Sequence, residues 1–257
     1  MNLPQNPFKR ALSDHRRQLG AFLALADAHS AEVMASAGFD WLLIDCEHAP
    51  NDLRLVLAQL QALAAYPVQP VLRLADHDAA RIKQALDLGV QNLLVPMVDS
   101  AEQARALVRA MHYPPRGIRG VGAGMARAAR WGAVDDYYGK APGELCLAVQ
   151  IETRAGLDDL DAIAAVDGVD GVFLGPADLA AALGHLGQPT HPEVRAAVEG
   201  ALPRIRAAGK AAGVYCGDAA LAAQYAALGA SFFLIAADSM LLRGAAVAAL
   251  GRFIADK

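Results

Sequence analysis

The side chains best suited to catalysis stand in four short segments, each at the end of an apolar run. These segments are Asp45-Cys46-Glu47-His48, Arg73, Gln150-Ile151-Glu152 and Gly175-Pro176-Ala177-Asp178. In folds built from parallel strands, the carboxyl ends of the strands open onto one face of the protein, and active sites lie there. If the apolar runs are such strands, these polar residues line a common pocket.

Glu152 and Asp178 are candidate ligands for a divalent metal ion. Carboxylate oxygens, with coordination positions left for water and substrate, suit Mg²⁺, Mn²⁺ or a similar ion such as Co²⁺. The alternative is structural: Glu152 pairs with Arg154, and Asp178 occupies the first turn of a helix, where carboxylates are common. The residues alone leave both interpretations open.

His48 and Arg73 are candidate catalytic residues. His48 follows Asp45 by three residues, so a turn can bring the carboxylate to one ring nitrogen and leave the other as a general base. The alternative is a solvated loop pair of Glu47 and His48. The rigid guanidinium of Arg73 matches an enolate or carboxylate oxygen, although a structural bridge to a nearby acid is also possible.

The lysines argue against an aldolase that forms a Schiff base with its substrate, because that mechanism needs a buried, well-placed amine. Two of the five lysines are near the chain ends, one is on a predicted helix, one is in a long irregular stretch and one begins a strand. They are Lys9, Lys83, Lys140, Lys210 and Lys257. An enolate-forming enzyme with these residues would need a metal ion to withdraw electrons.

Short apolar runs alternate with longer amphipathic ones, which is typical of βα units and a parallel sheet covered on both faces. We expect eight strands, at Leu19–Leu25, Asp40–Cys46, Gln69–Leu74, Gln91–Pro96, Leu145–Ile151, Val169–Gly175, Lys210–Tyr215 and Ser231–Ala236. Helices should lie between them, closed by C-cap glycines at Gly38, Gly89, Gly168, Gly209 and Gly229. Eight units in 257 residues predict one (β/α)8 barrel domain over residues 1–257.

One long irregular stretch, His112 to Gly143, interrupts this pattern. Its glycines at 120, 122 and 124 have the wrong spacing for a dinucleotide fingerprint and follow prolines rather than a strand. We interpret the stretch as a flexible loop whose arginines cover the open end of the barrel. Those arginines are Arg116, Arg119, Arg127 and Arg130.

The composition excludes several classes of function. A net charge of −4, with scattered basic residues, offers no surface for nucleic acid. Acidic and basic residues interrupt every long apolar stretch, so no membrane span is expected. Arg16-Arg17 loosely resembles an export signal, but Asp27 cuts short the apolar run that follows, and the first strand needs these residues. Three scattered cysteines suit the reducing cytoplasm.

Five long motifs, in order and over nearly the whole chain, resemble the class II, metal-dependent pyruvate aldolases. That family includes 4-hydroxy-2-oxoheptane-1,7-dioate aldolase and the 2-keto-3-deoxy sugar-acid aldolases. The motifs are Ala37–Pro50, Leu94–Met97, Tyr113–Gly122, Val149–Thr153 and Gly168–Asp178. The resemblance implies a (β/α)8 barrel that cleaves a 4-hydroxy-2-oxo acid to pyruvate and an aldehyde, with Mg²⁺, Mn²⁺ or Co²⁺ as cofactor.

The resemblance also implies roles for individual residues. It makes Glu152 and Asp178 the metal ligands, and Arg73 the group that stabilises the enolate. It makes His48 the base, paired with Asp45. The remaining implied residues are Gln150, Gly175 and the Ala177 backbone, which bind pyruvate, and Asp87, which supports the histidine from a neighbouring subunit.

The implied assembly is a homo-hexamer that exchanges the apolar C-terminal segment, Met240 to Ile254, between subunits. The implied substrate is 4-hydroxy-2-oxoheptane-1,7-dioate, which would give succinic semialdehyde and a place in aromatic catabolism. The chain departs from the family near the aldehyde, at Ala24 to His29 and at Tyr215-Cys216. Two alternatives therefore remain: a sugar-acid or hydroxypyruvate aldolase with the same site, and an inactive oligomeric barrel that binds keto acids.

Overall fold

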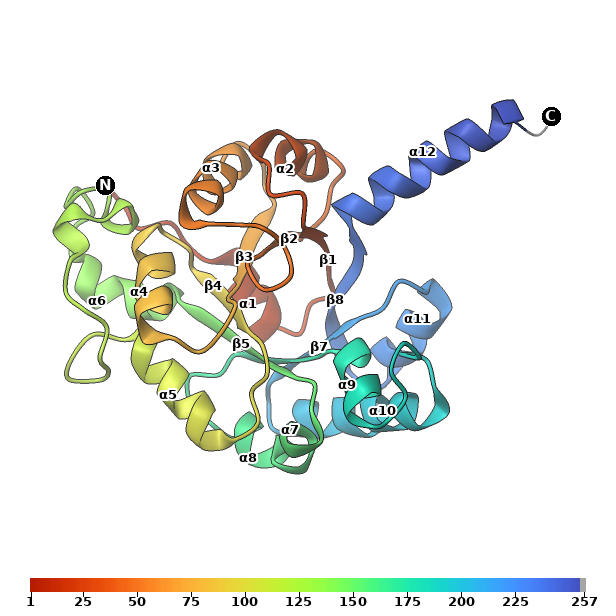
Figure 1. Cartoon of the computed structure of the whole chain (residues 1–257). Coiled ribbons are helices and arrows are strands. Elements are labelled where there is room, and N and C mark those ends of the chain that lie inside the picture. The colour runs from red at the N-terminus through yellow and green to blue at the C-terminus, as the bar shows by residue number, and fades with distance from the viewer. Residues whose placement is uncertain (255–257) are drawn as a thin grey trace.

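The computed structural model describes residues 1–254 and contains a closed barrel of eight parallel strands in sequence order (Figure 1). They are β1 (Gln18–Leu23), β2 (Trp41–Asp45), β3 (Gln69–Arg73), β4 (Asn92–Val95), β5 (Cys146–Ile151), β6 (Gly171–Leu174), β7 (Ala211–Tyr215) and β8 (Ala230–Ala237). Each strand pairs with the next, and β8 pairs with β1 to close the barrel. The eight predicted strands and the (β/α)8 fold are confirmed.

Helices surround the strands. They are α1 (Pro7–Ser13), α2 (Ala28–Ala35), α3 (Leu53–Leu63), α4 (Ala79–Asp87), α5 (Ala101–Met111), α6 (Tyr137–Glu144), α7 (Arg154–Asp158), α8 (Leu160–Ala164), α9 (Pro176–Ala182), α10 (Pro192–Ala207), α11 (Ala219–Ala227) and α12 (Asp238–Ile254). Aspartate side chains at 27, 52, 78 and 218 accept backbone N–H groups at the starts of α2, α3, α4 and α11. The five predicted C-cap glycines all have left-handed φ values, between 78° and 108°. Local sequence signals therefore fix the alternation of strand and helix.

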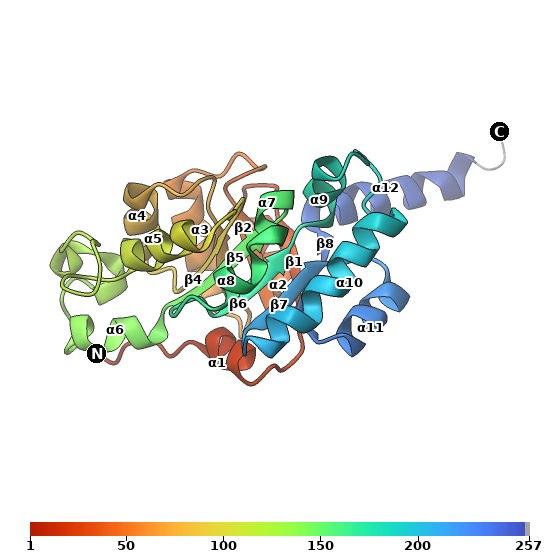
Figure 2. The same cartoon turned by 90° about the horizontal axis from the view of Figure 1, so that it is seen from below.

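A tightly packed apolar core fills the half of the barrel interior nearest the amino ends of the strands. Trp41, Phe173 and Phe232 point inward, and Phe8 and Leu12 of α1 close the amino end of the strands beneath them. Figure 2 shows α1 at the end of the barrel opposite α7 and α9. Because side chains alternate across a strand, the next inward positions lie at the carboxyl ends. Those positions are Asp45, Arg73, Gln150 and Tyr215.

The stretch after α5 is not the flexible loop that we expected over the mouth. It contains two 3-10 turns, Ala123–Met125 and Arg127–Ala129, and ends in α6, with a small apolar core of its own. Arg119 has a fully buried side chain that contacts Asp87, and Arg127 donates to the Leu88 carbonyl oxygen. These partners lie at the end of α4, next to the amino end of β4. The prediction that these two arginines cover the open end is therefore wrong.

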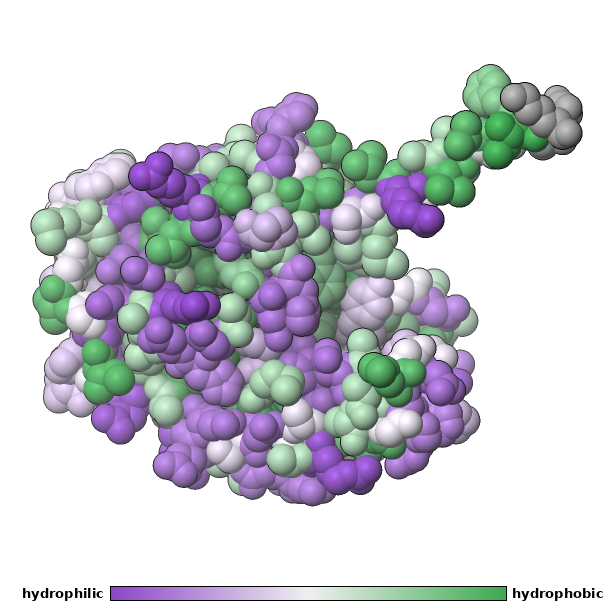
Figure 3. Space-filling view, viewed as in Figure 1, coloured by the Kyte–Doolittle hydropathy of each residue, from purple (hydrophilic) through white to green (hydrophobic). Residues whose placement is uncertain are grey.

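The last helix, α12, leaves the body of the protein (Figure 1). Asp238, its first residue, is buried and accepts N–H groups from Ala24 and Leu25, which ties the base of the helix to the loop after β1. Beyond that base the helix exposes Leu242, Phe253 and other large apolar side chains. Hydrophobic residues run along most of the projection in Figure 3. Among residues 1–254, no helix is long and apolar enough to cross a membrane.

Candidate active site

A buried ion pair forms the base of the candidate site. Arg73 donates through Nε and Nη2 to the two carboxylate oxygens of Asp45, at 2.9 and 2.8 Å. The two residues are direct neighbours in the β2–β3 register, so the sheet itself aligns them. Burial alone would raise the pKa of Asp45, but its hydrogen bonds and charge contact with Arg73 outweigh burial and lower that pKa. Asp45 is therefore ionised at neutral pH.

Glu47 is a second acid beside Arg73. Its Oε2 lies 2.9 Å from Arg73 Nη1, but it receives no aligned hydrogen bond, so the contact is a charge interaction. Burial raises the pKa of Glu47 more than the Arg73 charge lowers it. The structural bridge that we considered for Arg73 is confirmed. Within the described part of the chain, three N–H groups of the guanidinium have no hydrogen-bond acceptor.

His48 does not make the side-chain contact that we predicted. Its backbone N–H points to Asp45 Oδ1 at 3.4 Å, whereas its ring Nε2 lies 3.7 Å from Glu47 Oε2. Asp45 Oδ1 accepts N–H groups from Arg73 and from the backbones of Glu47 and His48, and Oδ2 accepts from Arg73, so donors other than the His48 ring hold this carboxylate. The His48 side chain is 66% exposed, and it can therefore rotate toward a substrate.

Glu152 is buried directly after β5 among polar donors. Its Oε1 accepts the Met97 N–H at 2.9 Å, and its Oε2 accepts the Gln150 side-chain amide. Burial raises the pKa of Glu152 to about 7 in spite of these two donors, and the nearby charges of Asp178 and Glu47 add to the rise. Arg154 is not an ion-pair partner of Glu152, so that part of the structural alternative is wrong, whereas its other part, Asp178 in the first turn of a helix, is confirmed. The Gln150 Oε1 atom is buried without a partner.

Asp178 and Ala177 are exposed in the first turn of α9, which follows β6. Gly175 precedes that helix, and any side chain there would collide with the Glu152 carboxylate and crowd the Gln150 amide. Only glycine therefore lets β6 approach β5 so closely. The first N–H groups of α9 have no acceptor within the helix, so they are available to an anionic ligand.

The site has a large excess of negative charge. Asp45, Glu47, Glu152 and Asp178 bring four carboxyl groups together, and Arg73 is the guanidinium among them. With all acids ionised and His48 neutral, this set has a net charge of about −3. Its carboxylate oxygens are the ligands that hard divalent cations prefer. The residues therefore fit a divalent metal ion.

Aromatic side chains lie beside this polar base. The Phe22 ring lies 5.0 Å below the Arg73 guanidinium, and the Tyr215 ring is 6.1 Å from Phe22. Tyr215 is one of the positions where the sequence departs from the family pattern. Another is His29, which lies on α2 with an 85% exposed side chain, 3.8 Å from Glu32.

Asp87 lies at the opposite end of the barrel from His48 within this chain. It is the last residue of α4, and its Oδ1 accepts from Arg119 Nη2 at 2.7 Å. A role for Asp87 beside His48 would therefore require another copy of the chain, as the family resemblance implies. The lysines at 9 and 210 also contact backbone carbonyl groups at this amino end. Lys257 lies outside the described residues.

Sequence reasoning missed two contributions to the site. Glu47 was assigned only to a solvated loop pair, although its position beside Asp45 and His48 in a strand-end motif was a usable signal. The Met97 N–H was missed because its direction depends on a left-handed φ of 55°, which the residue type does not predict.

Known proteins resemble this chain over almost its full length. The family model described as HpcH/HpaI aldolase/citrate lyase matches residues 18–245. A hydroxypyruvate/pyruvate aldolase of Deinococcus radiodurans is 63% identical over 241 residues, which cover 94% of this chain and 87% of that protein. A 4-hydroxy-2-oxo-heptane-1,7-dioate aldolase of Salmonella dublin is 53% identical over 253 residues, 98% of this chain and 96% of that protein.

A solved structure agrees with these sequence relatives. The crystal structure of an HpcH/HpaI aldolase/citrate lyase family protein from Burkholderia cenocepacia J2315 matches with a TM-score of 0.93 at 41% identity. The match covers 97% of this chain and 99% of that chain. The barrel, the acidic strand ends and these relatives lead to one assignment: the chain belongs to the HpcH/HpaI aldolase/citrate lyase family.

Proposed function

We propose that this chain is a pyruvate aldolase that cleaves a 4-hydroxy-2-oxo acid into pyruvate and an aldehyde. The observation that carries the proposal is the cluster of four carboxyl groups around Arg73 at the carboxyl ends of the strands. Such a site can bind a metal ion and a keto acid, and relatives at 53% and 63% identity are named as aldolases.

Glu152 and Asp178 are the proposed ligands of a divalent ion. When bound, Mg²⁺, Mn²⁺ or Co²⁺ would act as a Lewis acid that draws electrons from the 2-oxo group. The orphaned Gln150 oxygen, the space kept open by Gly175 and the free N–H of Ala177 are assigned to binding the pyruvate part of the substrate. Among residues 1–254, no lysine lies at this site to form a Schiff base.

The other steps of the reaction are assigned to three protein side chains. Arg73 donates an unused N–H to the substrate oxygen on which enolate charge develops. His48 takes the proton of the 4-hydroxyl group as that oxygen becomes the aldehyde carbonyl. The C3–C4 bond breaks, its electron pair enters the enolate, and protonation at C3 gives pyruvate. Asp45 holds the guanidinium in position throughout.

Hydroxypyruvate is a second candidate substrate. Three relatives that are 58% to 63% identical to this chain are named hydroxypyruvate/pyruvate aldolase, whereas the heptanedioate aldolases are 53% identical. Hydroxypyruvate has the same 2-oxo carboxylate as pyruvate and would use the same ligands. We therefore propose that the enzyme also accepts hydroxypyruvate. The other candidate for its natural reaction is cleavage of 4-hydroxy-2-oxoheptane-1,7-dioate in aromatic catabolism.

The exposed apolar face of α12 supports the proposed exchange of this helix in a homo-hexamer. Leu242, Val247, Leu250 and Phe253 are each more than half exposed on one helix, and a large exposed apolar surface of this kind marks an interaction site. A second copy would cover them, and a partner would also be the source of Asp87 for His48. The three free cysteines support a reducing, cytoplasmic setting. Residues 1–257 are proposed to act as one catalytic domain.

Metal removal tests the proposed reaction. Chelation should abolish cleavage of 4-hydroxy-2-oxo acids, and adding back Mg²⁺, Mn²⁺ or Co²⁺ should restore it. The same preparations should be treated with borohydride in the presence of pyruvate. A covalent pyruvate adduct trapped by borohydride would contradict the proposal, because trapping requires a Schiff base.

A further inference from the structure

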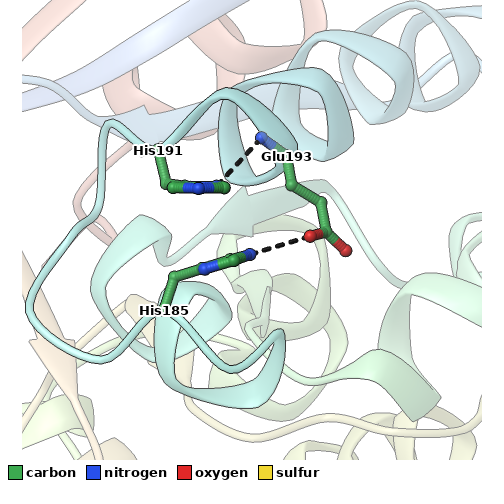
Figure 4. Close-up of side chains that lie close together, drawn as sticks. All are labelled: His185, His191 and Glu193. Atoms are coloured by element: carbon green, nitrogen blue, oxygen red, sulfur yellow. Dashed lines mark hydrogen bonds and ion pairs between the residues drawn. The ribbon is translucent and has the colours of Figure 1, made fainter.

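We propose that His185, His191 and Glu193, between α9 and α10, form a second metal site, for a zinc-class divalent ion. Within residues 1–254, they are the group of three whose possible ligand atoms all lie within 4.8 Å of one another. Figure 4 shows the two imidazole rings face to face, with the glutamate carboxylate beside them. The seven residues of α9, about 10 Å of helix, separate this cluster from the start of α9, where Asp178 lies.

The three side chains already converge. His185 Nε2 lies 2.8 Å from Glu193 Oε2, and the two imidazole rings stack with centroids 3.5 Å apart and planes at 17°. His191 Nδ1 accepts the Glu193 N–H at 3.3 Å, so that nitrogen carries a lone pair rather than a proton. A metal ion needs such a lone pair, and it would replace this long hydrogen bond and also the bond between His185 and Glu193, with loss of the His185 Nε2 proton.

Backbone hydrogen bonds fix the loop that carries the two histidines. The Gln188 N–H donates to the His185 carbonyl, and the His191 N–H donates to the Gln188 carbonyl, both at 2.9 Å. Gly184 and Gly187 have φ values of 89° and 79°, which allow the chain to turn tightly here. Little chain entropy would therefore be lost when an ion binds.

The ring of His191 accepts the N-cap hydrogen bond of α10, but capping alone does not select a histidine here. His191 is the N-cap of α10, a position where serine, threonine, aspartate or asparagine is preferred. The ion pair of His185 and Glu193 does not need a second imidazole stacked on it. Two imidazoles and one carboxylate, with a position open to water, are a usual ligand set for Zn²⁺.

The cluster is open to solvent. The side chains of His185 and Glu193 are 23% and 54% exposed, so an ion can enter. A bound ion would link the end of α9 to the start of α10.

A zinc titration tests this site. The full-length protein, with excess Mg²⁺ present to occupy the catalytic site, is titrated with Zn²⁺ in competition with a chromogenic chelator. We expect one zinc equivalent that persists in Glu152→Gln and weakens by more than about 100-fold in His185→Ala and His191→Ala, because loss of even an indirect supporting residue costs roughly 10- to 100-fold. Aldolase activity with Mg²⁺ should be unchanged in His191→Ala.

The control is His29→Ala, which removes a similar His–Glu pair that has no third ligand. It should bind zinc like the natural chain. Zn²⁺ should also raise the unfolding temperature of the natural chain and of Glu152→Gln, but not that of His191→Ala or Glu193→Gln. Equal zinc affinity in the natural chain and both histidine variants would overturn the proposal. So would loss of this zinc equivalent in Glu152→Gln, because the ion would then belong to the catalytic site.

Discussion

Replacing Glu152 with glutamine should make the metal-free protein more stable at alkaline pH than the natural chain. Burial raises the pKa of Glu152 to about 7, whereas the unfolded chain ionises this group near 4.5. Between these pH values the folded state binds more protons than the unfolded state, so stability falls as pH rises through this window. Above pH 7 the loss is complete and amounts to roughly 3 kcal/mol.

Glutamine removes this cost and keeps the local geometry. Its oxygen can accept the Met97 N–H as before, and its amide can donate to the buried Gln150 Oε1 after that amide flips. In metal-free samples at one protein concentration, the two proteins should have similar stability at pH 4.5. At pH 8 the variant should unfold roughly 6–12 °C higher, if 1 kcal/mol corresponds to roughly 2–4 °C in a chain of this size.

The measurement is thermal unfolding by circular dichroism from pH 4.5 to 8, with and without Mg²⁺. Added Mg²⁺ should remove the advantage of the variant at pH 8, because only the natural chain keeps both acidic ligands. A constant difference between the two proteins across this pH range would refute the reasoning, since the effect would then not arise from ionisation of Glu152. Lower stability of the variant at pH 8 without metal would refute it too.

Three further predictions concern other parts of the molecule. Arg73→Ala should lower both aldol cleavage and the exchange of pyruvate methyl protons in D₂O by roughly 10²–10³-fold. It should also destabilise the fold by about 3–5 kcal/mol because Asp45 is left buried and unpaired. Normal exchange in a folded variant would contradict this prediction. His48→Ala should lower cleavage by about 10²–10⁴-fold and proton exchange by less. The stability of the fold should not change, because this side chain is 66% exposed. Equal losses of cleavage in a coupled pyruvate assay and of exchange by proton NMR would mean that His48 also transfers the C3 proton. Truncation after Ala237 should break the assembly measured by light scattering, and a monomer peak for the full-length protein at micromolar concentration would count against exchange of α12.

The barrel was predictable from the sequence because its signals are local. Apolar runs, helical spacing and glycines before strands each act within a few residues, so all eight strands were predicted close to their observed bounds. The partners of the site residues were less predictable. Asp45 pairs with Arg73 rather than with the His48 ring because the β2–β3 register sets the two side by side, and no spacing along the chain shows that register.

The long stretch after α5 illustrates the same limit. Its glycines, prolines and arginines are typical of a mobile loop, but Arg119 is buried against Asp87, 32 residues earlier in the chain. Contacts with residues far away in the sequence, such as this ion pair, thus position the segment, and its composition alone does not predict that position. The same ion pair uses one oxygen of Asp87, Oδ1, so a contact of Asp87 with His48 of another copy would be made by the second oxygen.

The energetic cost of the acidic cluster is itself an argument for a bound cation. Arg73 pairs with Asp45 and Glu47, and within residues 1–254 neither Glu152 nor Asp178 forms an ion pair with a basic side chain. Ionised Glu152 costs roughly 3 kcal/mol in the metal-free fold, and an ion present at 100 times its Kd contributes about 2.7 kcal/mol in return. The two terms are of similar size, so a cation at 100 times its Kd would offset most of the cost of ionising Glu152. Metal binding and folding should therefore be coupled in this protein, and the coupling should weaken as pH falls below 7, where Glu152 takes up a proton instead.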